Sequence, residues 1–152
     1  MRTLKYTLLG GLVVGTLDAL DAMIFFGLRG AKPGRIFQGI AAGLIGPAAR
    51  DGGMPTVVLG IGLHYFIATM IVLVCVLLSR GVPVLRRHLI PAGMVYGLAA
   101  FLVMYLVVIP HSATGGGGLP RGAGLANALL IHMLGVGVPA AFAARAAAAK
   151  RR

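Results

Sequence analysis

The sequence has little charge, few acids and almost no cysteine. Only 11% of its 152 residues are charged, whereas an ordinary soluble domain carries roughly a quarter. This shortage, beside 59% hydrophobic residues, argues against a soluble domain and indicates a surface covered by lipid. The single cysteine, Cys75, excludes an intramolecular disulfide and a metal cluster of cysteines. Because Cys75 lies among valines and leucines, we interpret it as a small packed hydrophobe.

The patterns that would identify an enzyme are also missing from the sequence. It contains neither His-Glu-x-x-His nor the Glu-x-x-His pairs of di-iron bundles. Ser112 has no acid nearby, so a serine nucleophile is not expected. The glycine run 115–118 follows no strand and carries no Lys-Ser/Thr, so it is interpreted as a loop and not as a phosphate site. We therefore expect a non-enzymatic protein.

Four apolar stretches are long enough to cross a membrane as helices. A hydrocarbon core of ~30 Å needs about 20 residues at ~1.5 Å per residue, and a spanning segment has to satisfy its own backbone hydrogen bonds. The stretches are residues 7–28, 56–79, 89–109 and 123–144. Pro139 is expected to kink the last one. The sequence thus predicts an all-α membrane protein, a four-transmembrane-helix bundle that forms a single domain over residues 1–152.

The connection between the first two spans contains a shorter apolar segment, residues 36–49. It is too short to cross comfortably, and Ile36, Phe37, Ile40 and Leu44 fall on one helical face. We expect a helix that lies in the membrane interface. A re-entrant segment or a strained fifth span are the alternatives.

The charged residues are mostly basic, with 14 Lys and Arg against three acids and a net charge of +11. The cations stand at the ends of the apolar stretches, where they meet anionic lipid headgroups and set orientation, so no nucleic acid is expected as a partner. With both termini in the cytoplasm, the inside carries nine cations: Arg2, Lys5, Arg80, Arg86, Arg87, Arg145, Lys150, Arg151 and Arg152. The outside then carries five: Arg29, Lys32, Arg35, Arg50 and Arg121. This excess favours cytoplasmic termini.

Four of the outside cations surround the expected interfacial helix. Arg29, Lys32, Arg35 and Arg50 are candidates for contact with lipid headgroups or an acidic partner, and the alternative is ordinary solvated charge.

Small residues recur at spacings that allow helices to approach closely in lipid. The first span has Gly11-x-x-x-Gly15 and the third has Gly93-x-x-x-Gly97. Such faces favour packing within a bundle or self-association with other membrane helices.

Four ionisable side chains lie deep inside the predicted spans: Asp18, Asp21, His64 and His132. Each costs about 2.5–3.5 kcal/mol on insertion scales. Counted from the outer ends at ~1.5 Å per residue, all four lie roughly 10–15 Å deep, in the outer half. The i, i+3 spacing places both aspartates on one side of their helix. We expect all four to point into the bundle, with Met94, Tyr96, Met104 and Tyr105 of the third span as the available neighbours.

Several roles for these four residues remain open. Each Asp could pair with a His and only fix helix register, although membrane hydrogen bonds average about 0.6 kcal/mol and would not obviously offset the insertion cost. Two imidazoles with carboxylates also suit a transition metal. Intramembrane Asp and His groups recur in proton pathways. A haem held by His64 and His132 is a further alternative, although no propionate partners are obvious.

Four short groups of residues are distributed over most of the chain: Gly10-Gly11 with Gly15 and Asp18, Gly39-Ile40-Ala41-Ala42-Gly43, Gly62-Leu63-His64-Tyr65, and Ile131-His132-Met133 with Gly137 and Pro139. In these groups the chain resembles a family of uncharacterised small four-helix bacterial inner-membrane proteins. The resemblance implies a bacterial inner membrane and a multi-pass topology, and it transfers no functional residue.

The combined expectation is a non-enzymatic integral membrane protein with an Asp/His site in its outer half that binds a cation or exchanges protons. The alternative is a structural accessory subunit of a larger membrane complex, in which the same residues serve helix packing.

Overall fold

The computed structural model describes residues 1–114 and 116–149, and this part of the chain is helical without strands. Four helical stretches are long and apolar enough to cross a membrane: Arg2–Gly27, Gly53–Gly81, Leu89–Val108 and Ala123–Ala148. The number of long apolar helices predicted from the sequence is therefore confirmed. Gly115 of the expected loop and the tail Lys150-Arg151-Arg152 lie outside the described residues.

The first two long stretches are uninterrupted α-helices, α1 (Arg2–Gly27) and α3 (Gly53–Gly81). The third consists of α5 (Leu89–Val103) and the π-helical segment η2 (Met104–Val108). The fourth consists of α6 (Ala123–Leu130), the π-helical segment η3 (Ile131–Gly137) and α7 (Val138–Ala148). The π-helical segment η3 ends just before Pro139, whose missing N–H cannot bond the carbonyl one turn earlier. The fourth long helix therefore changes from π-helical to α-helical hydrogen bonding next to Pro139.

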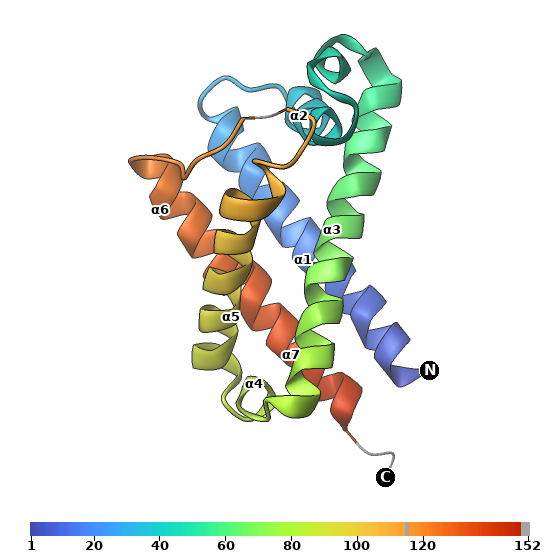
Figure 1. The fold of residues 1–152 in the computed structure, drawn as a ribbon, viewed down its shortest axis with the longest axis vertical. Helices are drawn as coiled ribbons and strands as arrows, with labels where there is room; N and C mark the ends of the chain where they lie inside the picture. The colour runs from blue at the N-terminus through green and yellow to red at the C-terminus, as the bar shows by residue number, and fades with distance from the viewer. Residues whose placement is uncertain (115, 150–152) are drawn as a thin grey trace.

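A short helix between the first two long ones agrees with the prediction from the sequence. It is α2 (Pro33–Ile45), followed by the 3-10 turn η1 (Pro47–Asp51). A further four-residue helix, α4 (Val84–Arg87), connects α3 to α5 and was not predicted. Figure 1 shows α2 at the end of the bundle where α1 ends and α3 begins, and α4 at the opposite end.

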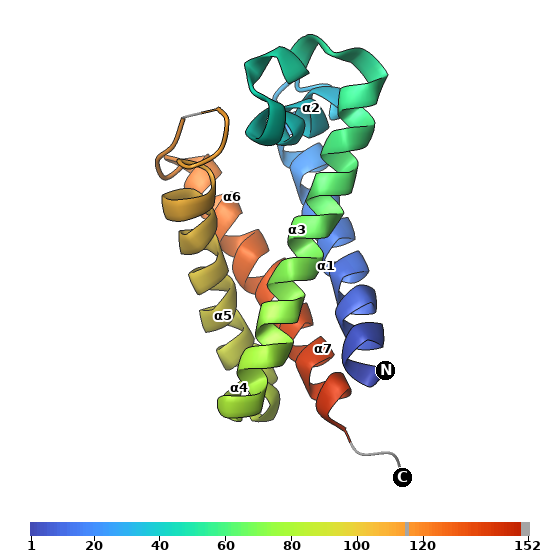
Figure 2. The ribbon, with the colours of Figure 1, turned by 45° about the vertical axis from the view of Figure 1, so that its right-hand side comes forward.

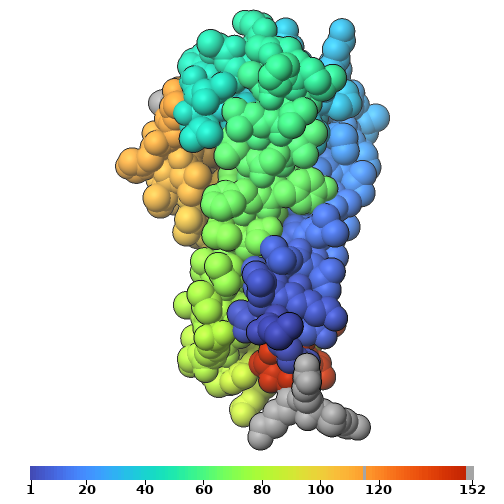
Figure 3. Space-filling view, turned by 90° about the vertical axis from the view of Figure 1, so that its right-hand side faces the viewer, coloured from blue at the N-terminus to red at the C-terminus, as the bar shows by residue number. Residues whose placement is uncertain are grey.

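The long helices form one elongated bundle (Figures 1 and 2). α1 packs against α3 and α7, and α5 packs against η3 and α7. Figure 3 shows α1 and α3 side by side along one face. The start of α1 and the end of α7 lie at one end, whereas α2 and the connection from η2 to α6 lie at the other.

Both glycine pairs predicted from the sequence lie at close helix contacts. A Cβ added at Gly11 would lie 2.7 Å from the Cα of Thr69 on α3. A Cβ added at Gly97 would lie 2.8 Å from the Cα of Met133 in η3. Contacts this short leave no room for a side chain, so the backbones touch, as membrane helices with small residues allow.

A small cluster of buried alanines joins α2 to η1, and a larger cluster of buried hydrophobic residues joins α1, α3, η3 and α7. Val72 and Cys75 of α3 pack there with Val136 and Ala140, and Cys75 has no exposed surface. This placement agrees with the interpretation of Cys75 as a packed hydrophobe. The candidate site lies beside the larger cluster, on the side toward α2.

Candidate functional site

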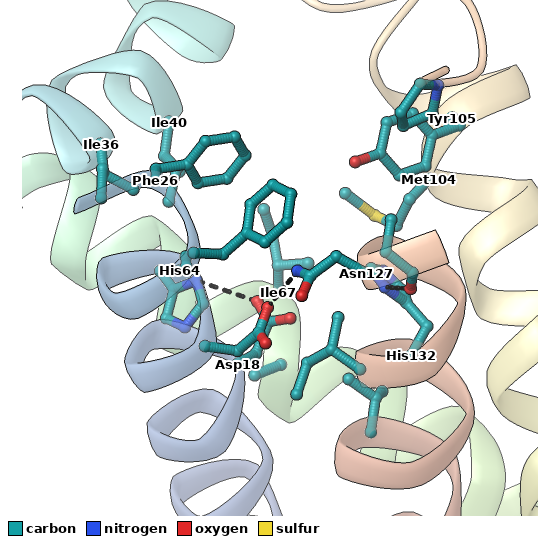
Figure 4. Close-up of a pocket in the computed structure, with 18 of the residues that line it drawn as sticks. Asp18, Phe26, Ile36, Ile40, His64, Ile67, Met104, Tyr105, Asn127 and His132 are labelled. Carbon is teal, nitrogen blue, oxygen red and sulfur yellow. Dashed lines mark hydrogen bonds and ion pairs between the residues drawn. The ribbon is translucent and has the colours of Figure 1, made fainter. Parts of the chain in front are cut away.

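A cavity of about 350 Å³ lies between the long helices in the half of the bundle nearest α2 (Figure 4). Residues of α1, α2 and α3 form one wall, and residues of η2, α6 and η3 form the other. All four ionisable residues singled out in the sequence line it: Asp18, Asp21, His64 and His132. The fold thus brings together side chains from three of the long helices.

His64 and Asp18 face each other across the contact of α3 with α1. The Nδ1 atom of His64 lies 4.0 Å from the Oδ2 atom of Asp18, which is ion-pair distance but longer than a hydrogen bond. The Nε2 atom of His64 lies 2.7 Å from the carbonyl oxygen of Gly15. Because a carbonyl oxygen can only accept, Nε2 must carry the hydrogen, and Nδ1 becomes the nitrogen that gains or loses a proton.

Asp21 lies one turn further along α1 and has a partner that sequence reasoning missed. The side-chain amide of Asn127 on α6 donates a hydrogen bond of 2.7 Å to Oδ2 of Asp21. The sequence could have indicated Asn127, because a carboxamide within a predicted span needs a hydrogen-bond partner and an unsatisfied polar group is costly in lipid. Asn127 carries no charge, so a pattern of ionisable residues does not include it.

His132 is held by its own helix and by aromatic rings. Its Nδ1 donates a 2.8 Å hydrogen bond to the carbonyl oxygen of Ala128, one turn earlier. The rings of Phe101 and Tyr105 on the neighbouring helix lie 5.5 and 6.3 Å away, centroid to centroid. The ring is therefore fixed in orientation, and Nε2 is the nitrogen left to accept or carry a further proton.

The four polar residues are not arranged as two Asp–His pairs. Asp18 faces His64, but Asp21 bonds Asn127 and His132 bonds a backbone carbonyl. The Asp–His pairing expected in the register-fixing account is therefore found for only one of the two aspartates.

Most of the remaining lining is apolar or aromatic. Figure 4 shows Phe26, Ile36 and Ile40 on one wall and Met104 and Tyr105 on the other. Met104 and Tyr105 were expected neighbours of the site. Tyr96 instead donates its hydroxyl hydrogen to the carbonyl oxygen of Ile71 and does not line the cavity.

The two π-helical segments both contribute to this cavity. Met104 and Tyr105 belong to η2, and His132 belongs to η3. The backbone N–H of Ile109 bonds the carbonyl of Met104, five residues back, at 2.9 Å. Such segments occur frequently at functional sites, because the extra residue in the turn re-aims the side chains beside it.

No family model, curated protein or solved structure matches the chain.

The metal hypothesis receives no support from the geometry. Within residues 1–114 and 116–149, no three His, Cys, Asp or Glu side chains are gathered closely enough to hold one ion. The haem alternative would have to use Nδ1 of His64 and Nε2 of His132, since the other ring nitrogen of each bonds a carbonyl.

The four basic residues of the first connection lie outside the cavity and are all exposed. Arg29 stacks over the ring of Phe25 at 3.6 Å and bonds its carbonyl oxygen. Arg35 lies 3.3 Å from Asp51 and also bonds the carbonyl of Arg50, so it ties α2 to η1. Their contact with lipid or with a partner stays a prediction.

Proposed function

We propose that the four long helices cross a membrane as one bundle, with α2 in the interface at the outer end. The distribution of charge supports this orientation. In the topology predicted from the sequence, nine Lys and Arg fall on the side of the termini and five on the side of the first connection, and the more basic side faces the cytoplasm. The resemblance to bacterial inner-membrane proteins suggests the cytoplasmic membrane of a bacterium as the location.

We further propose that the protein is non-enzymatic and that it exchanges protons at Asp18 and His64. The observation that carries it is the 4.0 Å approach of His64 Nδ1 to Asp18 Oδ2 beside an open cavity, with Nε2 tied to the carbonyl of Gly15. A proton on Nδ1 makes an imidazolium that pairs with the Asp18 carboxylate. Without that proton, Nδ1 presents a lone pair to the same carboxyl group.

Burial of these groups argues for a functional role. The side chain of His64 is only 10% exposed, and that of Asp18 is 30% exposed, toward the cavity. Ionisable groups at such depth cost several kcal/mol, and they usually mark ion or proton pathways. A hydrogen bond that only fixed register would return about 0.6 kcal/mol.

Infrared spectroscopy of the full chain in mild detergent tests proton exchange directly. The sequence has only three acidic side chains, Asp18, Asp21 and Asp51, so the carbonyl stretch of protonated carboxyl groups is unusually easy to assign. In the unmodified chain, we expect the band of protonated Asp18 to appear as the pH falls. This band should be absent in Asp18→Asn and should shift in His64→Gln.

Asp51→Asn is the matched control, because Asp51 is exposed and lies on η1 outside the cavity. This variant should keep the band assigned to Asp18. If Asp18→Asn folds normally by circular dichroism and titrates like the unmodified chain, Asp18 does not exchange protons, and the structural-subunit alternative becomes the better account.

A further inference from the structure

We propose that the cavity beside Asp18 binds a small amphipathic organic cation, such as an ammonium group carried on an aromatic or aliphatic body. This inference names a substrate class for the proposed proton-exchange site and rests on it. In a site of this kind the cation and the proton compete for the same carboxyl groups.

The charge of the lining selects a cation. Asp18 and Asp21, two of the three acids in the sequence, both line the cavity. No Lys or Arg of the described chain is among the lining residues. The two histidines of the lining, His64 and His132, are positive only when protonated. An anion would meet two carboxyl groups without a permanent positive charge, whereas a cation would supply the partner that a carboxylate needs away from water.

The size of the cavity selects an organic molecule. Its volume of about 350 Å³ falls within the range of roughly 300–1,000 Å³ found for small-molecule pockets. A proton or a bare metal ion needs far less space. No group of three metal-donating side chains is present in the described residues, which leaves a bulky cation as the better match.

The rest of the lining suits the body of such a molecule. Phe26 and Tyr105 present aromatic rings from opposite walls (Figure 4), and rings attract alkylammonium groups through their π faces. Ile36, Ile40 and Ile67 supply aliphatic surface. A few polar groups converge on an otherwise apolar pocket, which is the usual composition of a ligand site.

The test uses benzyltrimethylammonium, a permanent cation that cannot exchange a proton, and neopentylbenzene, its uncharged isostere. Equilibrium dialysis of the radiolabelled cation against the full chain in mild detergent should give saturable binding that weakens as the pH falls. Neopentylbenzene should compete at least tenfold less effectively than the unlabelled cation. Asp18→Asn should weaken binding at least tenfold, and Asp51→Asn should leave it unchanged.

A second variant keeps every polar group of the site. Ile40→Trp fills the cavity from α2 and should also weaken binding at least tenfold. The absence of saturable binding, or equal competition by neopentylbenzene, would overturn the cation site.

The infrared titration separates this inference from the proposed function. If Asp18 titrates but the cation does not bind, proton exchange stands and the cation site is wrong. If the cation binds but Asp18 does not titrate, the cation site stands and proton exchange is wrong.

Discussion

Asn127 on α6 donates a 2.7 Å hydrogen bond to Asp21 on α1 and so joins the first and last long helices beside the cavity. The two residues are 106 positions apart in the sequence. Their contact satisfies one oxygen of a carboxyl group that would otherwise be costly in lipid. It also leaves Asp18, and not Asp21, as the aspartate that faces a histidine.

Replacing Asn127 by leucine tests how much this hydrogen bond contributes to the free energy of unfolding. Loss of the amide donor should lower the free energy of unfolding by about 1 kcal/mol, within the range measured for membrane hydrogen bonds. Unfolding in mixed detergent micelles, followed by circular dichroism, measures the change. Tyr65→Phe is the control, since it removes the exposed 3.1 Å contact between Tyr65 and Thr16. An effect of Asn127→Leu no larger than that of Tyr65→Phe would contradict the prediction.

Close packing of α5 against η3 predicts that Gly97 tolerates no side chain. In Gly97→Ala the new Cβ would lie 2.8 Å from the Cα of Met133, so the helices must separate, with a loss of about 1–3 kcal/mol. Gly62→Ala is the matched control, because nothing lies within 4 Å of a Cβ there. The control should be neutral or more stable by up to about 1 kcal/mol. Equal stability of both variants in the same unfolding assay would show that α5 and η3 are not in backbone contact.

The backbone N–H of Ala113 donates a 2.8 Å hydrogen bond to the carbonyl of Gly43 and ties the connection after η2 to α2. Ala113→Pro removes this donor, so access to the cavity should become faster. The readout is the rate at which a water-soluble thiol reagent labels Ile40→Cys in a Cys75→Ala background. Ala113→Gly keeps the donor and serves as the control. Identical labelling rates in both variants would exclude a role for this bond in access.

The proposed topology predicts that the two ends of the bundle lie on opposite sides of the membrane. Ala48 in η1 and Val84 in α4 are exposed at these ends. In a Cys75→Ala background, Ala48→Cys should react with a membrane-impermeant thiol reagent from outside intact cells. Val84→Cys should react only in inverted vesicles. Labelling of both cysteines from the same side would refute the four-span arrangement.

The sequence alone predicted the four long helices, because the thickness of a membrane sets the length of an apolar helix. It also indicated Asp18, Asp21, His64 and His132, because ionisable side chains are rare and costly at such depth. Their spacing on each helix placed them toward the interior, and the structure brings them to one cavity. Gly11 and Gly97 were likewise recognisable from the pattern of small residues.

The partners of those residues were decided only by the tertiary structure. Spacing along one helix determines which face a side chain occupies, but not the rotation and axial shift of the neighbouring helix. For that reason the sequence could not tell that Asp21 would meet Asn127, or that His132 would bond the carbonyl of Ala128. The π-helical turns η2 and η3 and the cavity between them arise in the same way, from contacts between helices that no local pattern records.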